Sequence, residues 1–461
     1  MSFTLEAIRD WLDVHFEESV ARLGDFLRIP SVGTDPAHDA DTRRAAEWLA
    51  RELAALDLEV TLEATGGHPV VLARGGAADG PRLLYYGHYD VQPPDPLDEW
   101  RSPPFEPTIG DGPHGRRIVA RGAVDNKGQL MTIIEALRAV RAVAGGIPIG
   151  VTLMIEGEEE SGSPHLGDFL RTRRARLEAR AAVISDTTMI SPDRPAITDR
   201  LRGLLYLELA LQGPGRDLHS GLYGGVAPNP LHGLARLVAS LHDPGGRIAV
   251  SGFYDGVFEP EEEVRRSWRE LGFDEAAFLA AAGLEKASGE EGFSLLERLW
   301  ARPCLDVNGM WGGYTGDGQK TVIPSQAWAK LSARLVPDQD PEAVLARLET
   351  HLRAHCPADL QLSLRRLAAA APVRVPGDSP HLAAAERALS RVFPHPPVRI
   401  GCGGTIPVVA LLRDVLGLDS LLLGFGLDDD GAHSPNEKFE LICFRRGIES
   451  HAALIAECAG G

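Results

Sequence analysis

Cysteine is scarce in this chain of 461 residues, which has five widely spaced cysteines and no CxxC pair. An odd, sparse set argues against a disulfide framework and predicts reduced thiols. The first 20 residues also lack the basic segment and apolar stretch of a secretory signal peptide. Together these features favour a cytoplasmic protein.

Long apolar runs and an excess of basic residues are missing too. The nearest approach to a membrane span, residues 147–155, is short and contains Pro148, whereas a spanning helix needs about 18 apolar residues. Lys and Arg number 47 against 65 Asp and Glu, a net charge of −18. Such a charge repels nucleic acid and anionic lipid, so neither nucleic acid nor a membrane is an expected partner.

The pattern that is present predicts an α/β domain. Apolar runs at 70–76, 82–90, 117–125, 150–160, 181–188 and 420–426 alternate with helical patterns at 1–30, 42–56, 127–144 and 381–393. Strands that alternate with helices are typical of a mostly parallel sheet.

The pattern changes near residue 200. Polar and apolar residues alternate with period two at 204–213, 328–337 and 360–368, as expected for antiparallel strands with one exposed face. Helical patterns accompany them at 230–243 and 260–299. We therefore expect an α/β domain in two parts, 1–198 and 376–461, interrupted by a smaller α+β domain at 199–375.

Histidine and carboxylate side chains follow several of the predicted strands. These candidates are His88, Asp125, the acidic cluster 156–160, Asp186 and His433. Ligand sites in open α/β sheets form where strands reach their carboxyl ends. Two histidines and three carboxylates, with no cysteine among them, suit two divalent cations, with zinc preferred and manganese or cobalt as variants.

Two metal ions need more than five donor atoms, so one carboxylate should bridge them and water should fill the remaining positions. A bridging water with a lowered pKa can act as a nucleophile, and a glutamate of the run EGEEE can serve as its general base. The spacing does not choose between Glu158, Glu159 and Glu160. Asp90, two residues after His88, can accept the second imidazole N–H.

Nine motifs make the chain resemble the M20 family of dinuclear zinc metallopeptidases, and within it the carnosinase-like dipeptidase branch. They occur in the family's order and span nearly the whole chain. The motifs are GHYDVQP (87–93), RGAVDNKG (121–128), EGEEESGS (156–163), SDT (185–187), LHSG (218–221), KTVIP (320–324), RLVP (334–337), GGTIP (403–407) and AHSPNE (432–437).

The resemblance implies a zinc-peptidase fold with two metal ions per subunit. His88 and Asp186 would bind one ion, Glu160 and His433 the other, and Asp125 would bridge them.

The same resemblance implies that Glu159 is the general base and that Asp90 orients His88. It also implies that the inserted domain is a lid and dimerisation domain.

Four further residues resemble substrate contacts. Arg334 would bind the terminal carboxylate of the substrate, Thr321 and Thr405 would contribute hydroxyl groups, and His219 would reach the active site of the partner subunit in a homodimer.

The activity that this implies is hydrolysis of dipeptides with a free C-terminal carboxylate, a carboxypeptidase-like protease reaction. The alternative is hydrolysis of N-acyl or N-carbamoyl amino acids at the same site. Cys402 stands where the branch often has an acid, which weakens the case for recognition of a free substrate amine, and Asn126 stands where many relatives have Asp. A non-catalytic binding protein would have lost a ligand or the base, and all are present.

Overall fold

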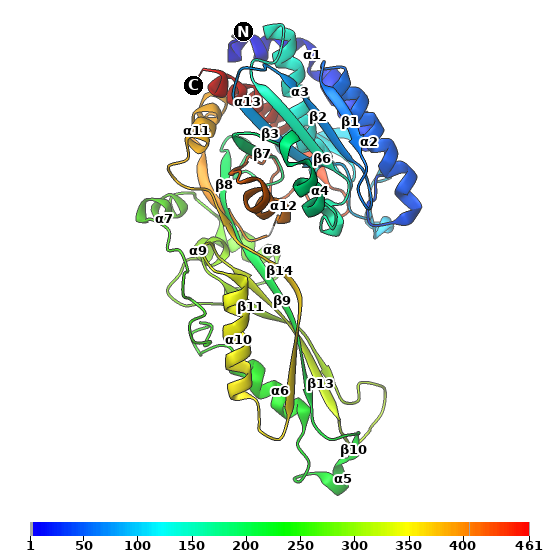
Figure 1. The fold of residues 1–461 in the computed structure, drawn as a ribbon, viewed down its shortest axis with the longest axis vertical. Coiled ribbons are helices and arrows are strands. Elements are labelled where there is room, and N and C mark those ends of the chain that lie inside the picture. Colours follow the sequence, from blue (N-terminus) through cyan, green and yellow to red (C-terminus); the bar gives the residue numbers. More distant parts are fainter. Residues whose placement is uncertain (1–2, 405, 461) are drawn as a thin grey trace. The chain divides into compact units, whose positions relative to one another are not determined.

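The computed structural model describes residues 3–404 and 406–460 (Figure 1). The chain divides into two compact units. The first, here called the α/β unit, comprises Met1–Asp199, Val375–Ile400 and Pro407–Gly461. The second, the inserted unit, comprises Arg200–Arg374 and the short segment Gly401–Ile406. The segment 401–406 thus groups with the inserted unit, although the sequence pattern places it in the second part of the α/β domain.

A nine-stranded mixed sheet forms the centre of the α/β unit. β3 runs parallel to β6 and β7, and β17 runs parallel to β7, whereas the pairs β1–β2, β2–β6, β8–β17 and β8–β15 are antiparallel. The order is β1 (Glu59–Glu63), β2 (Val70–Gly76), β6 (Gly150–Glu156), β3 (Arg82–His88), β7 (Ala181–Ile184), β17 (Ser420–Leu422), β8 (Ala196–Leu201) and β15 (Val373–Arg374), with β16 (Val398–Cys402) paired to β8.

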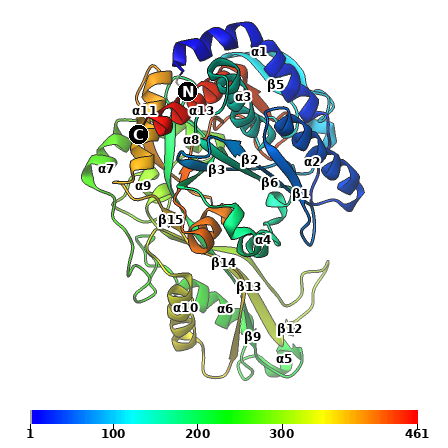
Figure 2. The same cartoon turned by 45° about the horizontal axis from the view of Figure 1, so that its top comes forward.

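Helices cover both faces of this sheet, which confirms the predicted α/β architecture (Figure 2). Alternate residues of the buried strands, such as Leu83 and Tyr85 of β3, join one core with the helices of the first face. These helices are α1 (Leu5–Leu27), α2 (Asp39–Ala54), α3 (Lys127–Ala144), α11 (Pro380–Val392) and α13 (Leu441–Ala459). The opposite face carries α4 (Leu166–Arg173) and α12 (Pro407–Leu411).

Short helical turns complete the α/β unit. They are η1 (Pro36–His38), η2 (Leu97–Glu99), η3 (Glu159–Ser161), η4 (Arg174–Arg176) and the π-helical turn η5 (Leu412–Leu416).

A second, three-stranded sheet contains residues that the sequence pattern assigned to the main sheet. It consists of β4 (Thr108–Gly112), β5 (Gly115–Val119) and β18 (Lys438–Glu440) in the order β18-β5-β4. The run 117–125 was expected as a strand of the main sheet. Only residues 117–119 of it are in a strand, β5, which ends at Val119. Asp125 therefore lies in the loop before α3, and His433 lies in a loop eleven residues beyond β17. Neither residue directly follows a strand of the main sheet.

The inserted unit is built on a four-stranded antiparallel sheet. Its order is β11 (Cys304–Gly312), β13 (Gln326–Leu335), β9 (Gly203–Gln212) and β14 (Gln361–Ala370), and β10 (Leu218–His219) pairs with β12 (Val322–Ile323). Buried and half-buried residues alternate along β9, as the period of two predicts. The buried face packs on α6 (Pro230–Ala239) and α10 (Pro341–His355).

The helical pattern at 260–299 forms three short helices rather than longer ones. These are α7 (Glu262–Arg269), α8 (Glu275–Ala281) and α9 (Leu295–Trp300). The inserted unit has one more short helix outside this segment, α5 (Ser220–Tyr223). Gly272 and Gly283, both with positive φ, lie in the breaks, where a left-handed backbone ends a helix.

No helix in the described part of the chain is both long enough and apolar enough to cross a membrane.

Candidate metal centre

Three parallel strands end together at one edge of the main sheet. β3 ends at His88, which pairs in register with Glu156 at the end of β6, and β7 ends two residues before Asp186. Because parallel strands have their carboxyl ends on the same edge, the side chains that follow them converge there. The sheet therefore places His88 and Asp186 close together.

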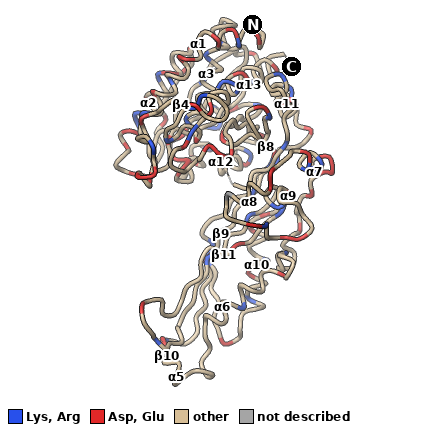
Figure 3. Tube along the Cα trace, turned by 180° about the vertical axis from the view of Figure 1, so that it is seen from behind, with Lys and Arg blue, Asp and Glu red and all other residues tan. Residues whose placement is uncertain are grey.

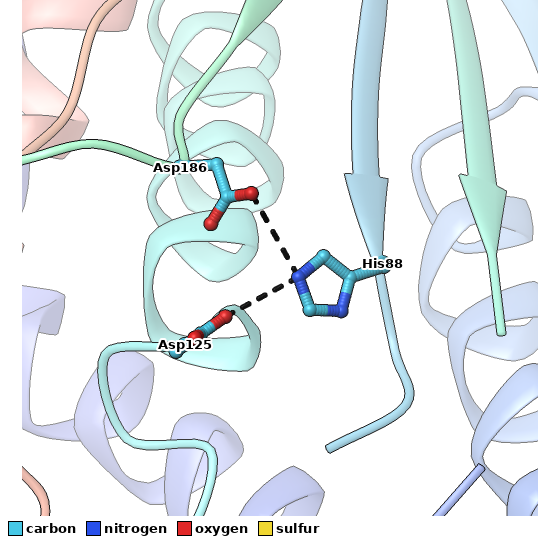
Figure 4. Close-up of side chains that lie close together, drawn as sticks. All are labelled: His88, Asp125 and Asp186. Atoms are coloured by element: carbon cyan, nitrogen blue, oxygen red, sulfur yellow. Dashed lines mark ion pairs between the residues drawn. The ribbon is translucent and has the colours of Figure 1, made fainter. Parts of the chain in front are cut away.

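His88, Asp125 and Asp186 form the first cluster of potential metal ligands (Figure 4). His88 Nε2 lies 3.3 Å from Asp125 Oδ1 and 3.9 Å from Asp186 Oδ2. One potential ligand atom from each residue lies within 4.8 Å of the other two. This spacing allows a single cation to contact all three side chains.

Asp125, Glu160 and His433 form a second cluster with the same spacing. His433 Nε2 lies 2.9 Å from Asp125 Oδ2 and 3.4 Å from Glu160 Oε2. Asp125 thus turns one carboxylate oxygen toward His88 and the other toward His433. A carboxylate in this position can contribute one oxygen to each of two cations.

The chemistry of the donors fits divalent metal ions. Among the described residues, His88 Nε2 and Glu160 Oε1 are buried atoms that have no hydrogen-bond partner, and such atoms are costly unless another group or an ion satisfies them. Imidazole nitrogens with carboxylate oxygens suit zinc, manganese or cobalt.

The carboxylates are crowded enough to change their protonation. Burial, together with the neighbouring Asp125 carboxylate, raises the pKa of Glu160 and that of Asp186 to about 7. The hydrogen bond with Asp125 raises the pKa of His433 to about 9. Burial lowers the pKa of His88, but the carboxylates of Asp125 and Asp90, each 3.3 Å from one of its ring nitrogens, outweigh burial and raise the pKa well above its usual value. The negative charge at this site therefore stabilises any cation that binds there, whether a proton or a metal ion.

The three glutamates of the acidic run have different surroundings. Glu158 Oε2 lies 2.9 Å from His165 Nδ1, and Glu160 belongs to the second cluster. Glu159 is on η3 and belongs to neither cluster. Burial is the largest cause that raises the pKa of Glu159 to about 7, which suits a group that exchanges protons near neutral pH.

Asp90 is fully buried beside His88. Its Oδ1 atom lies 3.3 Å from His88 Nδ1, and its backbone oxygen lies 3.1 Å from the same nitrogen. The structure therefore places Asp90 on the side of the imidazole that faces away from the first cluster.

Two amide side chains contact the clusters, and the sequence pattern gave neither of them this role. Asn126 Nδ2 donates hydrogen bonds to Asp186 Oδ1 at 2.8 Å and to the Ser185 carbonyl at 2.7 Å. Gln92 Nε2 donates to Glu160 Oε2 at 2.7 Å. Both residues lie within the quoted motifs, a few residues from a proposed ligand. That proximity in sequence was the only indication that they contact the clusters.

The predicted substrate contacts belong to the inserted unit, apart from Thr405, which lies outside the described residues. His219 is exposed on β10, where its Nδ1 accepts a hydrogen bond from Gly221 N–H at 3.0 Å. Thr321 is exposed before β12. Arg334 is half-buried on β13, paired in register with Cys304 of β11. Their roles toward the substrate stay predictions.

Comparison with known proteins places these features in a family. Residues 84–457 match the model of Peptidase family M20/M25/M40. The Cys-Gly metallodipeptidase dug1 of Schizosaccharomyces pombe is 30% identical, with 100% of this chain and 99% of the relative covered. The Beta-Ala-His dipeptidase of Homo sapiens is 31% identical, with 99% of this chain and 93% of the relative covered.

A solved structure supports the same assignment. The M20 family metallo-carboxypeptidase Sso-CP2 from Sulfolobus solfataricus superposes with a TM-score of 0.82 at 33% identity, covering 96% of this chain and 100% of that one. The resemblance found in the motifs is thereby confirmed. The chain belongs to Peptidase family M20/M25/M40 and is an enzyme, a metallopeptidase of that family.

Proposed function

We propose that this enzyme is a dinuclear metallodipeptidase that cleaves dipeptides with a free C-terminal carboxylate. The observation that carries the proposal is the placement of Asp125 between the two clusters, with one oxygen toward each. The full-length similarity to relatives named Cys-Gly and Beta-Ala-His dipeptidases supports the substrate class.

His88, Asp125 and Asp186 would hold one ion, and Asp125, Glu160 and His433 the other. Two bound divalent cations, with zinc preferred and manganese or cobalt as variants, would supply Lewis-acid chemistry, because a cation acidifies water and polarises a carbonyl oxygen.

The protein's own proton carrier would be Glu159. It belongs to neither cluster, and its pKa of about 7 allows it both to take and to release a proton near neutral pH. It would accept a proton from the attacking water and pass it to the leaving amine as the peptide C–N bond breaks. Asp90 would keep the imidazole of His88 in the orientation that directs Nε2 to the site.

Residues of the inserted unit would bind the substrate. The guanidinium of Arg334 suits the terminal carboxylate, because it can donate two parallel hydrogen bonds, and the hydroxyl groups of Thr321 and Thr405 would assist it. His219 would donate to the carbonyl oxygen as negative charge develops there. These contacts would restrict the enzyme to short substrates that end in a carboxylate.

We further propose that the enzyme is a homodimer assembled through the inserted unit, with His219 completing the partner's site. The segment 220–229 has no charged residue, and the trace at α5 itself is tan in Figure 3. Leu222 is 75% exposed and Val226 is 83% exposed. Two further exposed apolar side chains of the inserted unit are Trp311, on the edge strand β11, and Tyr314, two residues beyond its end. Such apolar surface favours association.

A substrate panel tests the proposed reaction. The protein, stripped of metal and reloaded with zinc, manganese or cobalt, would be offered Cys-Gly, β-Ala-His, other dipeptides, their N-acetylated forms, and N-acyl and N-carbamoyl amino acids. We expect the highest kcat/KM on dipeptides, whereas faster turnover of N-acyl or N-carbamoyl amino acids would reject the dipeptidase assignment. Comparison of each dipeptide with its N-acetylated form shows whether the free amine is recognised in the presence of Cys402.

A further inference from the structure

A fully buried carboxylate, that of Glu437, lies at the centre of the loop that carries Asp125. Its Oε2 accepts hydrogen bonds from Arg121 Nη1 at 2.7 Å and from Gly122 N–H at 2.8 Å. Its Oε1 accepts from the backbone N–H groups of Val124 at 2.8 Å and Asp125 at 2.9 Å. The loop before α3 thus wraps around one side chain.

Arg121 balances this buried charge and extends the contact to another loop. It is 1% exposed, and its Nη2 donates to the carbonyl oxygen of Pro93 at 3.3 Å. Pro93 follows His88 by five residues, and Glu437 follows His433 by four. The Arg121–Glu437 ion pair therefore joins the loop that follows His88 to the loops that carry Asp125 and His433.

The backbone of this loop depends on Glu437 for its hydrogen bonds. The segment 120–126 lies between β5 and α3, so neither a strand nor a helix satisfies the N–H groups of Gly122, Val124 and Asp125. Gly122 has φ +83°, and a Cβ there would lie 2.8 Å from Val91, so the tight course of the loop requires glycine. A carboxylate with four donors around it is matched to its surroundings, whereas an amide in its place would direct an NH₂ group at two donors.

We propose that Glu437 is a positioning residue for the metal centre, which fixes the Asp125 loop so that each carboxylate oxygen of Asp125 faces a different cluster. The inference rests on the proposed function, in which Asp125 bridges two cations. Glu437 itself touches neither substrate nor metal. Its effect passes through the backbone of Asp125 and through the loops that Arg121 joins.

Glu437→Gln tests this role because it removes the charge without changing the shape. Metal-free protein would be titrated with Co²⁺ by isothermal calorimetry, and uptake would be followed independently by the visible absorption of bound cobalt. We expect the affinity of the variant to fall by about 10–100-fold, as is typical when a group that orients a metal ligand is lost. Loss of the metal-dependent rise in Tm should accompany the weaker binding.

Glu135→Gln is the matched control. Glu135 is also a fully buried carboxylate of the α/β unit, and it accepts hydrogen bonds from Ser19 Oγ and Arg22 Nη2, both at 2.6 Å. Both variants should lower the Tm of the metal-free protein, but only Glu437→Gln should weaken cobalt binding. Equal weakening in the two variants would show a general effect of destabilisation and would overturn the proposal, as would unchanged affinity in Glu437→Gln.

Glu437→Asp decides the question if Glu437→Gln does not fold by circular dichroism. The aspartate keeps the charge but is one methylene too short to reach both pairs of donors, so an affinity loss of about tenfold is expected. Wild-type affinity in this variant would overturn the proposal. Failure of the wild-type protein to take up cobalt would reject the proposed function and this inference with it. Equal uptake by wild type and variants rejects the inference alone.

Discussion

The carboxylate of Asp90 accepts a hydrogen bond from the backbone N–H of Glu160 at 3.0 Å. Its other oxygen lies 3.3 Å from His88 Nδ1. Asp90 thus contacts one residue from each cluster, because His88 belongs to the first and Glu160 to the second. One buried side chain can therefore orient ligands on both sides of the site.

Asp90→Asn should lower both metal affinity and kcat/KM by about 10–100-fold, because the amide neither balances the imidazole charge nor accepts with both ends. Cobalt titration and steady-state kinetics measure the two effects. Asp168→Asn, at an exposed carboxylate of α4, is the control and should behave as wild type. Wild-type metal affinity and kcat/KM in Asp90→Asn would show that Asp90 does not orient the ligands.

Substitution of the three neighbouring glutamates should separate their roles. Glu159→Gln should bind two cations with near wild-type affinity but lose about 10²–10⁴-fold in kcat, because the base is gone. Glu160→Gln should mainly weaken metal binding, and Glu158→Gln, whose carboxylate contacts His165, should have a small effect on both. Metal titration alongside kinetics of all three variants tests this. Retained turnover in Glu159→Gln would reject it as the base.

Metal binding should strengthen as the pH rises from about 6 to 9. Glu160 and Asp186, with pKa values near 7, and His433, with a pKa near 9, all hold protons at pH 6 in the metal-free protein. A cation must displace those protons, and fewer remain as the pH rises. Calorimetry in two buffers of different ionisation enthalpy would measure the protons released. An affinity that does not change with pH would contradict the ligand assignment.

The sequence predicted the strand-end ligands better than it predicted the loops. His88 and Asp186 follow strands whose apolar runs are continuous, so their convergence at one sheet edge could be inferred from the pattern. Asp125 and His433 lie in loops whose course depends on Glu437 and on distant backbone contacts, which no local pattern encodes. Asp125 was expected at a strand end because the apolar run 117–125 resembles one continuous strand, whereas β5 ends at Val119.

Two helices, α10 and α13, were not predicted from the sequence. In α13 the polar residues Glu449, Ser450 and His451 are buried, so polar residues do not mark an exposed face of the helix. The start of α10 did carry a signal, since Asp340 caps the helix before Pro341 at its first position. The contacts of Asn126 and Gln92 required the structure, because an amide in a motif gives no indication of which carboxylate it meets.

Asn126→Asp should leave the enzyme folded but change its proton balance. The new carboxylate would replace an amide donor that lies 2.8 Å from Asp186 Oδ1. Two carboxylates at that distance cannot both ionise easily, so they should share a proton in the metal-free protein. Metal binding should then release up to about one more proton than in wild type, which gives a steeper pH dependence. The two-buffer calorimetry measures this, and an unchanged proton count would show that Asn126 does not tune Asp186.

Subunit mixing tests whether His219 acts on the partner's site. His219→Ala and Glu159→Gln homodimers should each be nearly inactive, because each lacks one group in both sites. In a mixed dimer the His219→Ala chain keeps Glu159 and receives His219 from its partner, so one of the two sites is complete. Random exchange should therefore restore about a quarter of wild-type activity.

Val226→Glu, which places a charge on the exposed apolar segment, should prevent dimer formation in analytical ultracentrifugation and abolish the recovery. If mixed dimers form, as verified with two distinguishable tags, and no activity returns, His219 acts within its own chain or not at all.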